Sequence, residues 1–192
     1  MKLGFLYAGQ GSQHPGMGQD LYEAYPAFRA VLDRADVGFD LKALCFQGPE
    51  QQLSQTRYTQ PCMVAFAAGL TAVLREQGIA PDLVAGLSLG EYSALAAAGV
   101  LEEQTAISLA AFRGKAMEEA AAGRDSAMVA VLGLDRERLL EAVREAEPLG
   151  AVVIANYNCP GQLVLGGERA AVQQAAALAK ARGARRCVPL RV

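Results

Sequence analysis

The chain has 192 residues, a length that allows one domain, or one domain with a smaller one inserted into it. Hydrophobic residues make up 52% of the sequence, enough for a packed core, and 18 basic against 20 acidic side chains give a net charge of -2. This balance excludes a general electrostatic attraction to nucleic acid or to an anionic membrane.

Neither a membrane span nor a secretion signal is predicted. The longest apolar run, Met63 to Val73, is too short to cross a bilayer, and the amino terminus lacks an apolar stretch with a cleavage site, so we expect a cytoplasmic protein. The cysteines, at positions 45, 62, 159 and 187, are widely spaced, and His14 is the only histidine. We therefore expect no metal site, no disulfide framework, and thiols that are buried or half-buried.

The first part of the chain alternates strand-like and helix-like segments, which predicts an α/β fold. Strands are expected at residues 3–7 and 83–86, and a glycine-rich loop follows the first of them. Helices are expected at residues 21–32 with a break at Pro26, at 61–78 beginning with Pro61, from about Ser88 to 98, and at 102–122. Only two parallel strands are evident, so we expect an incomplete sheet that is prone to self-association.

A second pattern starts near Asp125. Strands are predicted at 127–132, 151–155, 162–165 and 186–190, helices at 135–145 and 170–181, and a turn at 158–161. The order β-α-β-β-α-β is the ferredoxin-like arrangement. We therefore expect two parts: residues 1–124 as the amino-terminal, incomplete part of an α/β subdomain, and residues 125–192 as a ferredoxin-like small subdomain.

The most informative segment is Gly-Leu-Ser-Leu-Gly at residues 86–90, a G-x-S-x-G motif between a predicted strand and a predicted helix. In this context the motif indicates an α/β-hydrolase-like nucleophile turn, with Ser88 exposed at the end of the sheet. The backbone N–H of Leu89 then points into the same space and can hold a developing oxyanion. The alternative from the motif alone is a serine that only caps the helix.

Several ordered motifs carry a resemblance that covers essentially the whole chain. Residues 86–94, Gly-Leu-Ser-Leu-Gly-Glu-Tyr-Ser-Ala, resemble the active-site signature of malonyl-CoA:acyl-carrier-protein transacylases and of the related acyltransferase domains of polyketide synthases. Further segments are similar to landmarks of that family in the same order, namely residues 9–13, Gln60-Pro61, Arg113-Gly114-Lys115 and residues 156–162.

The resemblance implies a ping-pong transfer with Ser88 as nucleophile, malonyl-CoA as substrate and acyl carrier protein as partner, with no metal and no cofactor. Gln10 and Leu89 would form the oxyanion hole through their backbone N–H groups. Arg113 would pair with the free carboxylate of malonate, a task that suits its planar fork of donors, although a solvated helix charge is the alternative. Asn156 and Asn158 would face the cleft between the two units in the family arrangement, with Asn158 binding substrate, or serve side-chain-to-backbone bonding.

Two departures from the family pattern stand out. Leu87 occupies the place before the nucleophile where the family usually has histidine. The general-base histidine of the family follows the last strand of the small subdomain, and the chain ends at Val192, just short of that place. We therefore expect a carboxy-terminally truncated form with little or no turnover, because serine is a weak nucleophile without a base. His14 is the only other candidate base, and an exposed loop histidine is the stronger interpretation of it.

Two alternative functions remain open from the sequence. One is a non-catalytic module that binds acyl carrier protein or acyl-CoA, and the other is a generic serine hydrolase with a similar turn. The Gln10 loop and the Arg113 segment argue against the hydrolase. The resemblance also leaves open whether the pathway is fatty acid or polyketide biosynthesis.

Overall fold

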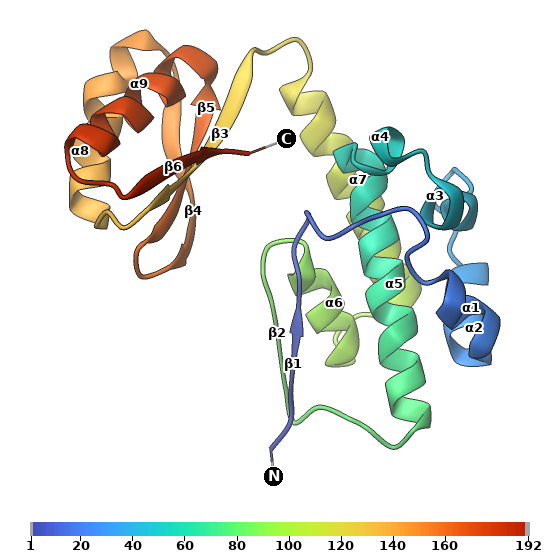
Figure 1. The fold of residues 1–192 in the computed structure, drawn as a ribbon. Helices are drawn as coiled ribbons and strands as arrows, with labels where there is room; N and C mark the ends of the chain where they lie inside the picture. Colours follow the sequence, from blue (N-terminus) through green and yellow to red (C-terminus); the bar gives the residue numbers. More distant parts are fainter. Residues whose placement is uncertain (1, 191–192) are drawn as a thin grey trace. The chain divides into compact units, whose positions relative to one another are not determined.

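A computed structural model describes residues 2–190, and the chain divides into two units between Ala120 and Ala121. Residues 191 and 192, which the sequence analysis assigned to the second part, lie outside the described residues. No helix in the described part is both long enough and apolar enough to cross a membrane. The α/β class expected from the sequence is confirmed, since one unit holds a parallel sheet and the other an antiparallel sheet (Figure 1).

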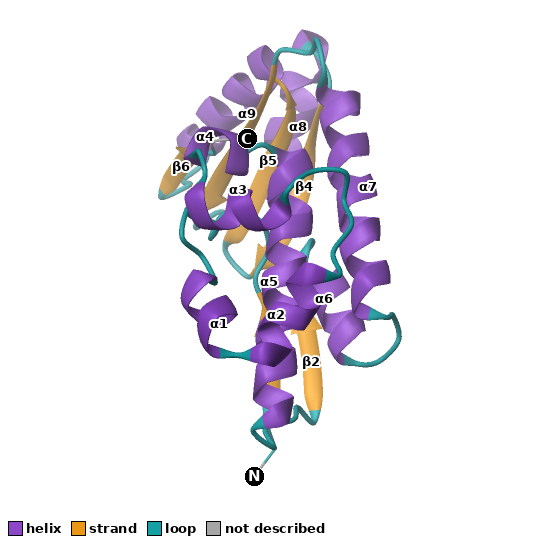
Figure 2. Cartoon of the chain, turned by 90° about the vertical axis from the view of Figure 1, so that its right-hand side faces the viewer, coloured by secondary structure: helices purple, strands orange, loops and turns teal. Residues whose placement is uncertain are grey.

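Unit 1 consists of a two-stranded parallel sheet and a set of helices. Strands β1 and β2 pair in register from Gly4 with Leu83 to Tyr7 with Gly86. Helix α6 packs against both strands, and the long helix α5 packs against α2 and α6 (Figures 1 and 2). The elements are β1 (Gly4–Tyr7), α1 (Gln19–Ala24), α2 (Pro26–Asp33), α3 (Leu41–Gln47), α4 (Glu50–Leu53), α5 (Thr56–Glu76), β2 (Leu83–Gly86), α6 (Gly90–Ala97) and α7 (Glu103–Ala121).

The two prolines of the predicted helices behave differently. Pro26 opens α2, where its fixed φ suits the first turn and its missing N–H costs nothing, so the predicted break is confirmed. Pro61 was predicted to begin a helix, and this is wrong, because α5 begins at Thr56 and Pro61 lies inside it. Because Pro61 lies close to the helix start, its missing N–H costs only the hydrogen bond to the carbonyl of Arg57. The helical turn before Pro61 includes Thr59 and Gln60, which are buried.

The core of unit 1 centres on Phe28 from α2, which has no exposed surface. Its ring lies edge-on to Phe66 of α5, with the ring centres 5.8 Å apart. Gly69, one turn further along α5, leaves room for the ring, because a β-carbon there would lie 2.7 Å from Cδ2 of Phe28. This close approach holds α5 against α2.

The sheet of unit 1 is covered on one face only among the described residues. Side chains alternate along a strand, so Tyr7 and Val84 lie half-buried on the face toward the helices, while Leu6 and Leu83 lie on the other face. Leu6 is 85% exposed and Leu83 is 68% exposed. The prediction of self-association through this sheet stays a prediction.

Unit 2 has the predicted ferredoxin-like order, with strands in the sequence β4-β5-β3-β6 across an antiparallel sheet. Helices α8 and α9 pack together and cover one face, where Leu139, Leu165 and Val172 are fully buried. Asp135 caps α8 as predicted, since its side chain accepts a bond of 2.8 Å from the amide of Arg138. The elements are β3 (Ser126–Leu132), α8 (Arg136–Ala146), a short 3-10 turn (Glu147–Leu149), β4 (Val152–Cys159), β5 (Gln162–Glu168), α9 (Arg169–Ala181) and β6 (Arg186–Pro189).

Two expectations for unit 2 and the cysteines need correction. Strand β4 does not end at residue 155 but runs to Cys159, because two register shifts let it keep pairing with β5. The turn is therefore only Pro160-Gly161, where Gly161 supplies the positive φ of 81°. Cys45 and Cys62 are buried and Cys187 is half-buried, but Cys159 is exposed beside this turn.

We predict that Gly69→Ala destabilises unit 1 through Phe28. Overpacking costs about 1–3 kcal/mol, more than the gain of about 1 kcal/mol from alanine in a helix. In a Phe28→Leu background the ring edge is gone, so the same change should cost about 1 kcal/mol less. Urea unfolding of the unchanged chain, the two single variants and the double variant measures the cost of Gly69→Ala with and without the Phe28 ring. Equal costs in the two backgrounds would contradict the role given to the ring.

Candidate active site

Ser88 occupies a sharp turn between β2 and α6. Its φ is 52°, the only positive φ of a non-glycine residue in the described part of the chain. A β-carbon on Gly86 would lie 2.1 Å from the carbonyl carbon of Gly90, and one on Gly90 would lie 2.2 Å from the oxygen of Tyr7. Both flanking positions therefore require glycine, and the strand, turn and helix are held together around the serine.

The hydroxyl of Ser88 does not cap the helix. Leu89 occupies the cap position of α6, and no side chain caps that end. Instead, Oγ of Ser88, which is exposed, accepts a hydrogen bond of 3.0 Å from Nη2 of Arg113. The alternative of a serine that serves only as a helix cap is therefore not supported by the geometry.

The loop after β1 lies against this turn. A β-carbon on Gly9 would lie 3.0 Å from the carbonyl oxygen of Leu87, so the backbone next to Gln10 approaches the residue before Ser88. The backbone N–H groups of Gln10 and Leu89 donate to no protein acceptor within residues 2–190. Two amides near the hydroxyl are thus free to donate to a ligand, which is what an oxyanion hole requires, although this role stays a prediction.

Arg113 reaches the serine from the middle of α7. Its Nη1 donates a bond of 2.8 Å to Oε1 of Gln60, and its guanidinium carbon lies 6.0 Å from the centre of the Tyr92 ring. The next residue, Gly114, lets α7 approach the start of α5, because a β-carbon there would lie 2.7 Å from the oxygen of Thr56. The arginine is therefore held in place by α5, α6 and the turn, and it is not a solvated helix charge.

Sequence reasoning missed Gln60 as a site residue. It appeared only within the Gln60-Pro61 landmark, yet it is 1% exposed and bonds to Arg113, which in turn bonds to Ser88. Its position just before an apolar helical stretch was the available signal, because a polar residue at a core position needs a specific partner. The partner itself was not predictable, since 53 residues separate the two in the chain.

The other residues named from the sequence make no hydrogen bond to Ser88 or Arg113 within residues 2–190. His14 is exposed, and its Nδ1 lies 3.1 Å from the carbonyl oxygen of Pro15, not at the serine hydroxyl. Leu87 is 54% exposed on the turn. Asn156 and Asn158 lie in unit 2 as half-buried residues of β4, so their roles toward a substrate stay predictions.

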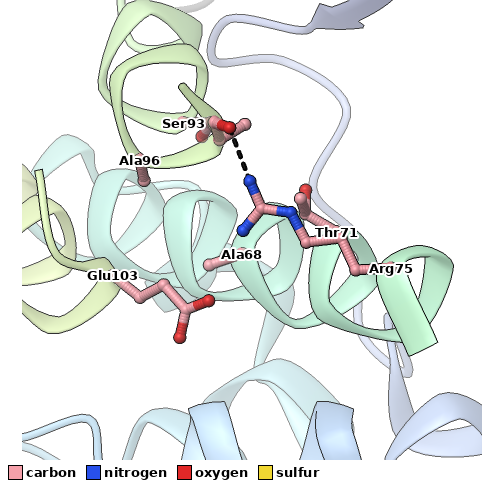
Figure 3. A pocket seen from close by; sticks show the side chains of 7 residues that line it. Ala68, Thr71, Arg75, Ser93, Ala96 and Glu103 are labelled. Carbon is pink, nitrogen blue, oxygen red and sulfur yellow. Dashed lines mark hydrogen bonds between the residues drawn. The ribbon is translucent and has the colours of Figure 1, made fainter. Parts of the chain in front are cut away.

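A small cavity lies between α5, α6 and the start of α7 (Figure 3). Its volume is about 10 Å³, which is room for one water molecule and not for an acyl group. Arg75 lines it and donates a bond of 2.6 Å to the carbonyl oxygen of Ala97, and Ser93 and Glu103 lie nearby. Neither Ser88 nor Arg113 lines this cavity, so it is separate from the candidate site.

Comparison with known proteins points in one direction. The family model described as "Acyl transferase domain" matches residues 4–190. A malonyl CoA-acyl carrier protein transacylase of Bacillus subtilis is 42% identical over 194 aligned positions, which cover 100% of this chain and 61% of that protein. The corresponding protein of Escherichia coli K12 is also 42% identical, with 63% of its length covered.

Solved structures agree with these relatives. A malonyl transacylase of Streptococcus pneumoniae superimposes with a TM-score of 0.91 at 48% identity, covering 100% of this chain and 63% of that one. A second solved structure is that of a type II polyketide acyl-carrier protein in complex with its malonyl-transacylase. A chain of this complex superimposes with a TM-score of 0.92 at 44% identity, covering 100% of this chain and 63% of that one. The chain therefore spans a little over three fifths of the length of the proteins it matches.

We predict that the backbone at Ser88 is strained. Glycine tolerates a positive φ and alanine does not, so Ser88→Gly should be more stable than Ser88→Ala by about 1 kcal/mol. Ser93, inside α6, is the matched control, because there glycine should be less stable than alanine by about 1 kcal/mol. Thermal and urea unfolding of the glycine and alanine variants at positions 88 and 93 measures their stabilities. If alanine were more stable than glycine at both positions, the strain at Ser88 would be contradicted.

Proposed function

The chain belongs to the acyl transferase domain family, and we propose that its Ser88 takes the malonyl group from malonyl-CoA and passes it to the phosphopantetheine thiol of acyl carrier protein. One observation carries the proposal: an exposed hydroxyl on a strained turn is hydrogen-bonded to an arginine that a buried glutamine holds in place. The names of the relatives and the acyl-carrier-protein complex among the solved structures support the choice of substrate and partner.

The first half of the reaction forms an ester on Ser88. Its Oγ attacks the thioester carbonyl carbon of malonyl-CoA, and the proton of the hydroxyl passes to a base. The carbonyl oxygen becomes an oxyanion, which the amides of Gln10 and Leu89 are free to stabilise, and the amino end of α6 adds a favourable dipole. When the carbonyl re-forms, the carbon–sulfur bond breaks and CoA leaves as the thiol after it takes up a proton.

The second half repeats these steps with the carrier protein. The thiol of the phosphopantetheine arm loses a proton and attacks the ester carbonyl, and the carbon–oxygen bond to Ser88 breaks. The serine hydroxyl recovers a proton and the malonyl group leaves as a new thioester. This chemistry needs only side chains, backbone amides and the two thiols, so the proposal includes no metal and no cofactor.

Arg113 is proposed to recognise the free carboxylate of the malonyl group. In the structure one of its terminal nitrogens is 3.0 Å from Ser88 Oγ, so a carboxylate bound to the guanidinium would lie next to the nucleophile. Two parallel bonds from the planar fork would fix the distance between that carboxylate and the thioester carbon. An acetyl group offers no carboxylate and would leave the guanidinium unpaired.

The base that activates Ser88 is not among the described contacts of its hydroxyl. Within residues 2–190, Oγ is bonded only to Arg113, which carries no lone pair able to take a proton. A serine hydroxyl without a positioned base is a weak nucleophile. We therefore propose that the 192-residue chain binds malonyl-CoA but acylates slowly.

The competing functions are separable by this chemistry. The chemistry of a generic serine hydrolase does not require an arginine beside its nucleophile, and a binding module does not require a strained backbone at a serine.

We further propose a cytoplasmic role in fatty acid or polyketide biosynthesis. Four free thiols in the described part support a reducing compartment.

We predict slow malonyl addition to Ser88 that added imidazole accelerates, because imidazole can act as the base. Intact-mass measurement after incubation with malonyl-CoA follows the ester, and Ser88→Ala controls for direct reaction with imidazole. Fast, stoichiometric addition without imidazole would refute slow acylation. No ester under either condition, combined with no malonyl-CoA binding, would refute the transferase function itself.

We also predict that Arg113→Ala discriminates between acyl groups. Binding of malonyl-CoA, measured by calorimetry, should weaken by about tenfold or more, since a charge-assisted bidentate pair is lost. Binding of acetyl-CoA should change by no more than about twofold. Lys115→Ala removes a charge from the same helix at an exposed position and serves as the control. Equal losses for the two ligands would contradict a carboxylate-binding role.

A further inference from the structure

Gln60 is a buried side chain with both polar atoms in use. It lies on α5 with 1% of its surface exposed, and its Oε1 accepts the bond of 2.8 Å from Nη1 of Arg113. Its Nε2 lies 3.3 Å from Sδ of Met117, which is one helical turn beyond Arg113 on α7. The glutamine therefore contacts α7 at two points, and one of them fixes the guanidinium that reaches the nucleophile.

The partners of Arg113 are all neutral. They are the amide oxygen of Gln60, the hydroxyl of Ser88 and the ring of Tyr92. No carboxylate within residues 2–190 forms an ion pair with it. In unit 1, Arg57 differs, because it pairs with the carboxylate of Glu118 at 3.8 Å. An amide oxygen orients a guanidinium as a carboxylate would, but it leaves the full positive charge in place.

We propose that Gln60 is a positioning residue that sets the acyl specificity of the site, because it holds Arg113 without neutralising it. The inference rests on the proposed function, since it takes the carboxylate of a malonyl group as the ligand of Arg113. A half-buried guanidinium with only neutral partners attracts an anion more strongly than one that already has a counter-ion. The neutral amide thus favours acyl groups that carry a free carboxylate.

A glutamate at this position would reverse the effect. Glutamate has nearly the same shape as glutamine, so its carboxylate would occupy the place of Oε1, within bonding distance of Nη1. It would neutralise Arg113 and compete with the substrate carboxylate for the same cation. A glutamate carboxylate has no N–H to donate to Sδ of Met117, so that contact would also be lost. The expected result is a site that no longer distinguishes malonyl from acetyl groups.

The alternative is that Gln60 only fills space between α5 and α7. Methionine has a similar length and carries no charge, so Gln60→Met keeps the packing and removes the acceptor for Arg113. A purely structural role predicts that Gln60→Met and Gln60→Glu change the binding of both acyl-CoA ligands in proportion. A positioning role predicts that only the malonyl ligand is affected.

The test is calorimetric titration of the protein with malonyl-CoA and with acetyl-CoA. In Gln60→Glu the ratio of the two dissociation constants should fall at least tenfold, while acetyl-CoA binding stays within about twofold. Gln60→Met should lower the ratio by about threefold. Gln55→Glu, which adds the same charge at an exposed position just before α5, should leave the ratio unchanged.

Each outcome decides the question. If the unchanged chain prefers malonyl-CoA and Gln60→Glu keeps that preference, the role of Gln60 is overturned and the proposed function stands. If Gln60→Glu does not fold, an unchanged ratio in Gln60→Met overturns the role. If the unchanged chain shows no preference for malonyl-CoA, the proposed function and the role of Gln60 both fall.

Discussion

The positive φ of Ser88 is the constraint on which the site depends. It exists only because β2 turns abruptly into α6, and that turn is closed by two contacts that leave no room for a β-carbon at Gly86 or Gly90. Without the bend, Ser88 would continue the strand. The backbone N–H of Leu89 would then be used in hydrogen bonds of the sheet or the helix. The strain is modest in energy, and the packing of α6 against both strands supplies enough stabilisation to maintain it.

The second layer of the site is electrostatic and comes from helices α5 and α7, which lie outside the segment that forms the strand, the Ser88 turn and α6. Helix α7 carries Arg113 and α5 carries its acceptor, Gln60, while Gly114 allows the two helices to approach closely. The side chain of Arg113 thereby links the helical part of unit 1 to Ser88 on the turn. The hydrogen bond from the guanidinium to Ser88 Oγ also orients the hydroxyl.

The sequence predicts the local features well and the long-range ones poorly. The G-x-S-x-G spacing, the proline that opens α2 and the aspartate that caps α8 each act within a few residues, and all three were foreseen. The start of α5 was not, because burial of Thr59 and Gln60 outweighs the local preference of Pro61. Strand β4 was expected to be shorter, because its last residues are held by pairing with β5 and not by their own propensity. The bond between Gln60 and Arg113 depends on packing of two helices and has no local signal.

The pairing of β1 with β2 has a consequence for how the site is assembled. Gly4 pairs with Leu83, so β2, which leads into the Ser88 turn, pairs with a strand that lies about 79 residues earlier in the chain. Parallel contacts of such high sequence separation form slowly, since a long loop must close before they add any stability. We therefore expect the bend at Ser88, which packs against the carbonyl oxygen of Tyr7, to form late in folding. In a chain where β1 has not yet paired with β2, we expect the Ser88 turn to be unformed.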